Sequence, residues 1–311
     1  MSVLRAPILA LARSERLRDS LLASPVTREV VERYVPGVST EDAVAATRTL
    51  VDHGMQVTLD HLGEDTLDGG RARATVTAYV DLLGALADAG LARHAEVSVK
   101  LTALGLVLPG DGPRLALEHA RSICRAARNA GTTVTIDMED HTTTERTLAI
   151  LRDLRKDFPE TGGVLQSQLF RTEGDCRALT HEESRIRLCK GAYAEPDEVA
   201  YGDRHEIDRA FVRCLRTLMA GGGYPMVATH DPRLIEITGA LAGRYSRPRG
   251  SYEFQMLYGI RPEEQRRLVE RGETVRVYLP YGQEWYGYLM RRLAERPANL
   301  TLFARSLVSQ K

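Results

Sequence analysis

The chain has 311 residues, of which 43% are hydrophobic and 27% charged, as is ordinary for a globular protein of one large or two small domains. Its 42 basic and 42 acidic side chains balance, and no apolar run approaches membrane-spanning length. These features argue against a nucleic-acid partner and against a membrane-spanning chain, so we expect a small ligand.

The expected elements begin with about fifty mostly helical residues, which we assign to an N-terminal helical arm at 1–50. Short β-rich runs then alternate with longer helical patterns through a main domain at 51–311. The eight expected strands are 55–60, 95–101, 133–137, 163–169, 185–190, 225–230, 252–257 and 274–279. Eight consecutive βα units predict an α/β fold, a closed (βα)8 barrel of the TIM type.

The alternative fold is an open, doubly wound sheet. That fold should carry a glycine-rich phosphate turn after an early strand, and no G-x-G-x-x-G follows any expected strand. The run GGG at 221–223 precedes a strand, so we interpret it as a helix C-terminal stop. The barrel is therefore the favoured prediction.

The cysteine pattern predicts reduced thiols and no metal site. The four cysteines are widely spaced, without a C-x-x-C pair or a zinc-finger spacing with histidine: Cys124, Cys176, Cys189 and Cys214. We therefore expect a reducing compartment, the cytoplasm.

Polar residues interrupt the hydrophobic pattern at or just past the ends of the expected strands. They are Asp60, Glu64, Lys100, Asp137, Glu139, Gln166, Arg187, Lys190, His230, Gln255 and Tyr278. Active sites of (βα)8 barrels lie at this face. Lys100 alternates in phase with Ser98, so we expect it to point to the mouth or interior of the barrel, where a lysine needs an anionic partner.

After the last strand, a predicted helix carries two adjacent arginines. Tyr288, Arg291, Arg292 and Glu295 share one face of it at helical spacing. Paired guanidiniums suit a carboxylate ligand, because each offers rigid paired donors. The alternative is a solvated Arg/Glu surface.

Together these residues resemble the flavin-dependent proline dehydrogenases in their short, single-function bacterial form. The motifs that carry the resemblance are SVKL around Lys100, IDMED from Asp137, VLQ ending at Gln166, RLCKGAY from Arg187 to Tyr193, ATHD ending at Asp231, EFQMLYG from Glu253, and YLPYG followed by YLMRRLAERPAN. They span roughly residues 50 to 300, and their combination is specific although each alone is weak.

The resemblance implies a distorted (βα)8 barrel that binds FAD noncovalently over its strand ends. It also implies that L-proline is oxidised to Δ1-pyrroline-5-carboxylate, the first step of proline catabolism to glutamate, by hydride transfer from the ring carbon next to nitrogen to flavin N5. Since the cofactor carries the redox step, the protein chiefly orients the reactants.

By carry-over of the motifs, Arg291 and Arg292 are expected to bind the proline carboxylate through paired hydrogen bonds, and Lys100 adds a third positive charge. The residues expected to wall the proline ring are Tyr278, Tyr288 and Leu257. Asp137 and Arg187 hold the family's catalytic positions, and we expect Asp137 to orient a cationic neighbour rather than to abstract a proton. Tyr278 should crowd a ring hydroxyl, which favours proline over hydroxyproline.

The resemblance assigns a larger set of residues to the flavin. They are Met138, Gln166, Arg187, Lys190, Gly191, Ala192, Tyr193, Thr229, His230 and Glu295. Glu64 resembles the family's gate residue, which pairs with the first arginine of the RR motif when the site closes. One departure is that the family usually continues Ala-Tyr after the strand-four glutamine, whereas this chain has Ser167 and Gln168.

The resemblance also implies partners. The electron acceptor is expected to be a quinone, reached by peripheral docking of the N-terminal helices at the inner face of the membrane. The chain has no room for the aldehyde dehydrogenase domain of the bifunctional relatives, so a separate pyrroline-5-carboxylate dehydrogenase is expected to consume the product.

Two other classes stay open from the residues alone. A Schiff-base aldolase would also place a lysine, Lys100 or Lys190, at a strand end. A barrel that binds a ligand without catalysis is the third class.

Overall fold

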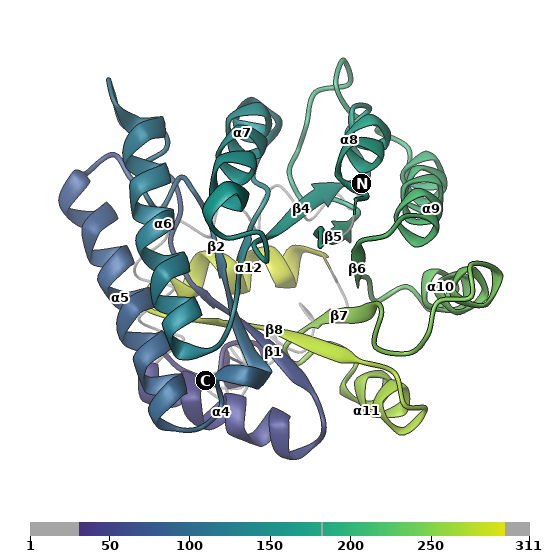
Figure 1. Cartoon of the computed structure of the whole chain (residues 1–311), viewed down its shortest axis with the longest axis horizontal. Coiled ribbons are helices and arrows are strands. Elements are labelled where there is room, and N and C mark those ends of the chain that lie inside the picture. Colours follow the sequence, from purple (N-terminus) through teal and green to yellow (C-terminus); the bar gives the residue numbers. More distant parts are fainter. Residues whose placement is uncertain (1–30, 182, 296–311) are drawn as a thin grey trace, which may run out of the picture.

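The computed structural model describes residues 31–181 and 183–295, with the side chains of 291–295 left out. Its centre is a closed barrel of parallel strands in which each strand pairs with the next and the last pairs with the first (Figure 1). The strands are β1 Gln56–His61, β2 Ala95–Val99, β3 Val134–Ile136, β4 Gly162–Gln166, β5 Arg185–Cys189, β6 Tyr224–Ala228, β7 Glu253–Leu257 and β8 Val275–Tyr281. The barrel prediction is confirmed.

Helices form the outer layer around this barrel (Figure 1). The described helices are α4 Thr40–Asp52, α5 Gly69–Asp88, the short 3₁₀ turn η1 Ala92–His94, α6 Gly112–Ala130, α7 His141–Asp157, α8 Thr172–Leu179, α9 Arg204–Ala220, α10 Pro232–Arg244, α11 Pro262–Glu270 and α12 Trp285–Glu295. α9 ends one residue before Gly221, so the interpretation of the GGG run as a helix stop is correct.

Five strands, β2, β3, β4, β5 and β6, end one to three residues earlier than the sequence pattern indicated. β2 stops at Val99 and β4 at Gln166. After β4 the chain leaves the barrel, because Leu169 forms an isolated antiparallel bridge with Ala200. Lys100 consequently lies just beyond its strand, at the rim of the barrel.

Aspartate caps start several helices immediately after the strand-end loops. Asp140 accepts a hydrogen bond from the Thr142 amide at the start of α7, and Asp231 accepts one from the Arg233 amide at the start of α10. These caps satisfy backbone amides that have no partner within the helix. The loops are therefore held where they pass the barrel rim.

The apolar core lies between the strands and the surrounding helices. On β2, Val97 and Val99 are fully buried in this core, whereas Glu96 and Ser98 alternate with them on the inner side of the barrel. Interiors of such barrels are commonly filled by branched aliphatic residues. Here hydrogen-bonded and ion-paired side chains share the interior with apolar ones such as Val164 and Met226.

The helix after β8 departs from the regular pattern of outer helices. α12 crosses the barrel in the view of Figure 1, and its Tyr288 and Leu289 belong to a second apolar cluster with Tyr34, Val35 and Leu62. Tyr288 also lines the cavity at the strand ends. The barrel is distorted in this sense, as the resemblance implied.

The N-terminal part of the chain is described only from residue 31. α4 begins within the expected arm, ends two residues beyond it at Asp52, and packs against α5, β1 and β8. The expected helices of residues 1–30 lie outside the described residues, and the domain division at residue 50 stays a prediction. None of the helices that the structure describes has the length and apolar character needed to cross a bilayer.

Candidate active site

A cavity of about 510 Å³ opens at the C-terminal ends of the strands. It gathers every predicted site residue whose side chain is described: Glu64, Lys100, Asp137, Met138, Gln166, Arg187, Lys190, Gly191, Ala192, Tyr193, Thr229, His230, Leu257, Tyr278 and Tyr288. Because these residues come from well-separated parts of the sequence, only the closed barrel brings them together.

Arg187 lies at the floor of the cavity. Its Nη1 donates to Ser98 Oγ at 2.9 Å and to Asp137 Oδ1 at 3.0 Å, and its Nε donates to Gln255 Oε1 at 2.5 Å. Burial acts to lower the pKa of the guanidinium, but Asp137 and Glu96 outweigh burial and raise it. Arg187 is thus a fixed positive charge at the base of the site.

Asp137 joins Arg187 to Tyr278. The Tyr278 hydroxyl donates to Asp137 Oδ2 at 2.7 Å, while Oδ1 of the same carboxylate accepts from Arg187. The Arg187 guanidinium also lies 5.2 Å from the centre of the Tyr278 ring. Burial, followed by the charge of Asp137, raises the pKa of Tyr278 well above its ordinary value, so the phenol stays protonated. Asp137 therefore accepts one hydrogen bond at each carboxylate oxygen and joins the two side chains.

Lys100 forms an ion pair with Asp60 across the first two strands. Its Nζ lies 2.6 Å from Asp60 Oδ2, and the two side chains are 12% and 2% exposed. Burial alone would lower the pKa of Lys100, but Asp60 and Asp137 outweigh it and raise the pKa above the ordinary range. The ammonium stays charged, which suits an anionic ligand and opposes attack on a carbonyl.

Lys190 lies on the opposite side of the barrel, between two carboxylates. Its Nζ is 2.5 Å from Asp208 Oδ1 and 3.2 Å from Asp231 Oδ2, and both aspartates also pair with Arg233. Lys190 is about one-third exposed and faces the cavity. Like Lys100, it is ion-paired and so is a poor Schiff-base nucleophile.

The loop after β5 approaches the cavity with its backbone. Gly191 has φ +113°, a conformation that side-chain-bearing residues rarely adopt, and a Cβ there would overlap the Gln168 side chain. Gln168 is buried, and its Nε2 donates to the Tyr193 carbonyl at 3.4 Å. The residue that departs from the family pattern therefore supports this loop from below.

Two further contacts fix the neighbouring walls. Gln166 donates through Nε2 to the Glu139 carbonyl at 2.6 Å, and Leu257 donates its amide to His230 Nε2 at 2.9 Å. Because Nε2 of His230 accepts this hydrogen bond, the neutral ring carries its proton on Nδ1. Met138 is 7% exposed and lines the cavity beside these groups.

Cys189 also lines the cavity. Burial raises the pKa of its thiol to about 12, so the reactive thiolate is not populated near neutral pH. This agrees with an inert buried cysteine.

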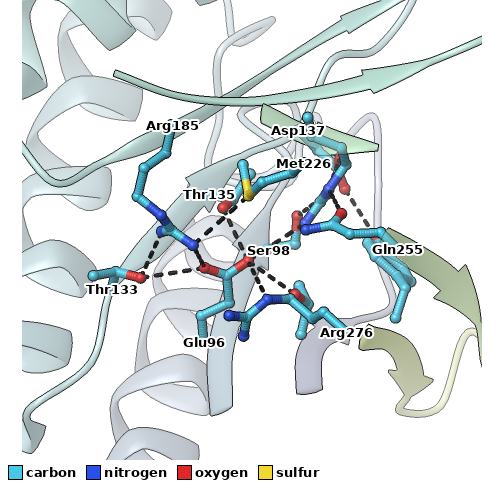
Figure 2. Close-up of polar contacts among 12 residues, drawn as sticks. Glu96, Ser98, Thr133, Thr135, Asp137, Arg185, Met226, Gln255 and Arg276 are labelled. Atoms are coloured by element: carbon cyan, nitrogen blue, oxygen red, sulfur yellow. Dashed lines mark hydrogen bonds and ion pairs between the residues drawn. The ribbon is translucent and has the colours of Figure 1, made fainter. Parts of the chain in front are cut away.

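Beneath the cavity the barrel holds a layer of charges that the sequence reasoning did not single out. Figure 2 shows Arg185 and Arg276 directed at Glu96. Arg185 Nη2 is 2.8 Å from Glu96 Oε2, Arg276 Nε is 3.9 Å from Oε1, and Arg187 Nη2 is 3.6 Å from Oε1. Burial acts to raise the pKa of Glu96, but the three arginines outweigh it and lower the pKa.

A signal for this layer is present in the sequence. Arg185, Glu253 and Arg276 each stand two residues before a residue that the strand-end pattern singles out, and Glu96 stands four residues before Lys100. A period of two puts both members of each pair on the same face of a strand, which here is the interior. Asp208 of α9, which pairs with Lys190, has no comparable signal.

Three predicted residues cannot be placed at the level of their side chains. Arg291, Arg292 and Glu295 belong to α12, whose side chains from residue 291 lie outside the described part of the chain. Their assignment to the substrate and the cofactor, and the contact between Glu64 and Arg291, stay predictions.

A family model described as proline dehydrogenase matches residues 43–305. Proline dehydrogenase 1 of Bacillus subtilis (strain 168) is 38% identical over 284 residues, covering 91% of this chain and 92% of that protein. The proline dehydrogenase of Deinococcus radiodurans is 37% identical over 306 residues, covering 98% of this chain and 97% of that protein.

A solved structure gives the same fold. The crystal structure of proline utilization A (PutA) from Bdellovibrio bacteriovorus, inactivated by N-propargylglycine, matches with a TM-score of 0.80 and 24% identity. The match covers 88% of this chain and 33% of that one. At this identity the likeness supports the barrel architecture.

Proposed function

Because this chain belongs to the proline dehydrogenase family, we propose that it oxidises L-proline to Δ1-pyrroline-5-carboxylate with noncovalently bound FAD. One observation carries the proposal: a single cavity holds the fixed cations Lys100 and Arg187 together with the aromatic side chains of Tyr278 and Tyr288. A small cyclic amino acid needs this combination of a carboxylate partner and an apolar wall.

The lining of the cavity suits a flavin. Met138, Val164 and Met256 offer an apolar surface, while Lys190 and the backbone at Gly191 offer positive charge and close approach for a pyrophosphate. Gln166, Thr229, His230, Ala192 and Tyr193 complete the proposed contacts, with Glu295 from α12. When bound, the flavin supplies the hydride acceptor.

The residues of the chain bind and orient the substrate. Lys100 attracts the proline carboxylate, with Arg291 and Arg292 as its proposed partners on α12, while Tyr278, Tyr288 and Leu257 enclose the ring. Asp137 and Arg187 act as the catalytic pair by fixing Tyr278 and the floor of the site. The proline amine loses its proton to water before a hydride leaves the neighbouring ring carbon.

Tyr278 supports a preference for proline over hydroxyproline. Its hydroxyl is held by Asp137, so the ring cannot turn aside to admit a substituent. We expect kcat/KM for L-proline to exceed that for hydroxyproline at least tenfold. Equal values for the two substrates would remove this assignment.

The first test is an absorbance spectrum of the purified protein before and after anaerobic L-proline. We expect flavin bands that bleach with L-proline and persist with D-proline. A colourless protein that neither binds added FAD nor bleaches would overturn the proposal. Borohydride trapping then tests the aldolase alternative, which the ion pairs of Lys100 and Lys190 already disfavour.

We further propose a quinone acceptor, docking at the inner face of the membrane from the cytoplasm, and a separate pyrroline-5-carboxylate dehydrogenase for the product. Residues 1–25, which would dock, lie outside the described part. Truncation of these residues should slow flavin reoxidation by quinone-loaded vesicles while leaving bleaching by proline intact. An unchanged reoxidation rate would remove docking from the proposal.

A further inference from the structure

Below the active site, β7 begins with a carboxylate, Glu253. Glu253 is fully buried on the inner side of the barrel. Its Oε1 accepts from Arg276 Nε at 2.7 Å and from Gln255 Nε2 at 2.6 Å, and its Oε2 accepts from Arg276 Nη2 and the Tyr224 hydroxyl, both at 3.1 Å. The carboxylate therefore holds groups from three strands.

Gln255 connects this carboxylate to Arg187. Its amide nitrogen donates to Glu253, and its amide oxygen accepts from Arg187 Nε at 2.5 Å. A carboxylate only accepts hydrogen bonds and a guanidinium only donates them. The two neighbours together therefore allow the Gln255 amide one orientation, with its oxygen on the side of the active site.

That orientation matters because the Gln255 oxygen is the acceptor for Arg187 Nε, whereas Nη2 lies 3.6 Å from Glu96 Oε1. The side chain is 5% exposed, and among the described residues its Nη2 has no hydrogen-bond partner. The Nε contact with Gln255 and the Nη1 contacts with Ser98 and Asp137 hold the plane of the guanidinium. An amide turned the other way would place its NH₂ group against Arg187 Nε, two donors facing each other without water.

We propose that Glu253 is a positioning residue for Arg187, which acts by fixing the Gln255 amide so that an oxygen faces Arg187 Nε. Glu253 does not line the cavity, and it reaches Arg187 through Gln255, which contacts both residues. Only the kinetic part of this inference rests on the proposed function, because the contact itself exists whatever the substrate is.

Glu253→Gln isolates this role. An amide at position 253 has one oxygen for donors that the carboxylate divides between Oε1 and Oε2, and when that oxygen takes the place of Oε2 it accepts from Arg276 Nη2 and the Tyr224 hydroxyl. Its NH₂ group then faces Gln255, whose own oxygen turns toward position 253. The NH₂ group of Gln255 is left against Arg187.

A swapped double variant, Glu253→Gln with Gln255→Glu, separates positioning from ion pairing. The new carboxylate at position 255 accepts from Arg187 in either orientation, and the amide at 253 donates to it while its oxygen accepts from Arg276. Net charge is unchanged. If Glu253 served only as the counter-ion of Arg276, the swap would not restore what Glu253→Gln loses.

The measurement is solvent exchange of the Arg187 Nε–H by NMR on protein with ¹⁵N-labelled arginine, the signal being assigned with Arg187→Lys. We expect exchange at least tenfold faster in Glu253→Gln and a return to within threefold of the wild-type rate in the swap. Turnover with proline should fall about tenfold in Glu253→Gln with KM within twofold, since Lys100 is untouched, and should recover in the swap.

Glu264→Gln is the matched control, because it removes an arginine-paired carboxylate on α11. It should leave both the exchange rate and the turnover at wild-type values.

Unchanged Nε–H exchange in Glu253→Gln overturns the proposal, as does a swap that recovers neither readout. If Glu253→Gln does not fold, Gln255→Met removes the same acceptor from Arg187. Unchanged Nε–H exchange in that variant also overturns the proposal. Absence of proline turnover in the wild type would count against the proposed function, whereas the exchange readout would still decide the role of Glu253.

Discussion

At the residue scale, Lys100 and Asp60 are a buried pair in which each charge depends on the other. Removal of one partner of such a pair leaves an uncompensated buried charge, which costs about 3–5 kcal/mol. Asp60 depends on its partner more than Lys100 does. Its side chain is 2% exposed, and its Oδ1 has no hydrogen-bond partner among the described residues, so Lys100 supplies its neutralising charge.

Lys100→Met should therefore raise KM for proline at least tenfold and lower the free energy of unfolding by several kcal/mol. Urea unfolding and steady-state kinetics measure the two effects. Adding Asp60→Asn should return most of the lost stability, because no buried charge is then left, without restoring KM. A double variant as unstable as Lys100→Met would contradict this account.

Glu139 predicts a pH dependence of stability. Burial raises its pKa from 4.5 to about 7, against the lowering effect of its hydrogen bonds from Thr102. Below pH 4.5 the carboxyl is protonated in the folded and the unfolded chain, so it adds no pH dependence. Between 4.5 and 7 only the unfolded chain ionises, and stability falls as pH rises.

At about 1.4 kcal/mol per pH unit, the raised pKa of Glu139 contributes about 3 kcal/mol to stability at low pH, and this contribution is fully lost above pH 7. Glu139→Gln lacks the titration, so the stability difference between variant and wild type should shift by about that amount between pH 4.5 and 8. Parallel pH profiles of the unfolding free energy in the two proteins would show that burial does not control this group.

At the element scale, the loop after β5 depends on the fit between Gly191 and Gln168. The position requires φ +113°, and a Cβ there would overlap Gln168. Two separate penalties thus oppose a side chain at residue 191: backbone strain of about 1–2 kcal/mol and a steric clash.

Gly191→Ala should weaken FAD binding at least tenfold, measured by titration of the apoprotein. Combining it with Gln168→Ala should recover only part of the affinity, because the clash is relieved and the strain remains. Full recovery would mean that the left-handed backbone plays no part. Gly174→Ala is a suitable control, since a Cβ at that helical position meets no atom within 4 Å.

How far the sequence predicts these elements depends on what determines each one. Alternating apolar runs located all eight strands, because outward residues such as Val97 and Ile186 must face the helices. The ends of β2 and β4 were placed too late, since apolar residues such as Leu101 and Leu169 continue past the point where pairing stops. Pairing depends on the tertiary path and not on local composition.

The sequence predicted which positions form the candidate site, but not the hydrogen bonds and ion pairs that connect them. Strand-end placement and family motifs found Lys100, Asp137 and Arg187, and the structure brings them into one cavity. The partners Glu96, Glu253 and Asp208 were missed. An ion pair joins residues far apart in sequence, and no local pattern states which carboxylate meets which arginine.

At the scale of the whole molecule, a layer of buried ion pairs fills the barrel interior, and removal of one charge leaves its partners without a counter-ion. Glu96 is 2% exposed and faces three arginines. Glu96→Gln should lower the free energy of unfolding by about 3–5 kcal/mol, because the arginines lose their common counter-ion in a buried site. Chemical denaturation measures the change.

The control for this layer is Glu118→Gln, which breaks an exposed pair with Arg114 and should change stability by less than about 1 kcal/mol. The lowered pKa of Glu96 also gives a pH signature. Its contribution is present above the unfolded value of 4.5 and is lost as pH falls below it, so wild type should lose stability in acid more steeply than Glu96→Gln. Identical acid profiles would contradict this assignment.

The pairing of β1 with β8 joins the beginning of the barrel to its end, with Gln56 opposite Arg276 and His61 opposite Tyr281. During synthesis, β1 emerges from the ribosome more than two hundred residues before its partner exists. Until then, both β1 and the most recent strand expose unpaired edges, which are templates for association with other chains. Closure is thus a late, long-range event, and the nascent chain is most vulnerable to aggregation while it waits for its final strand.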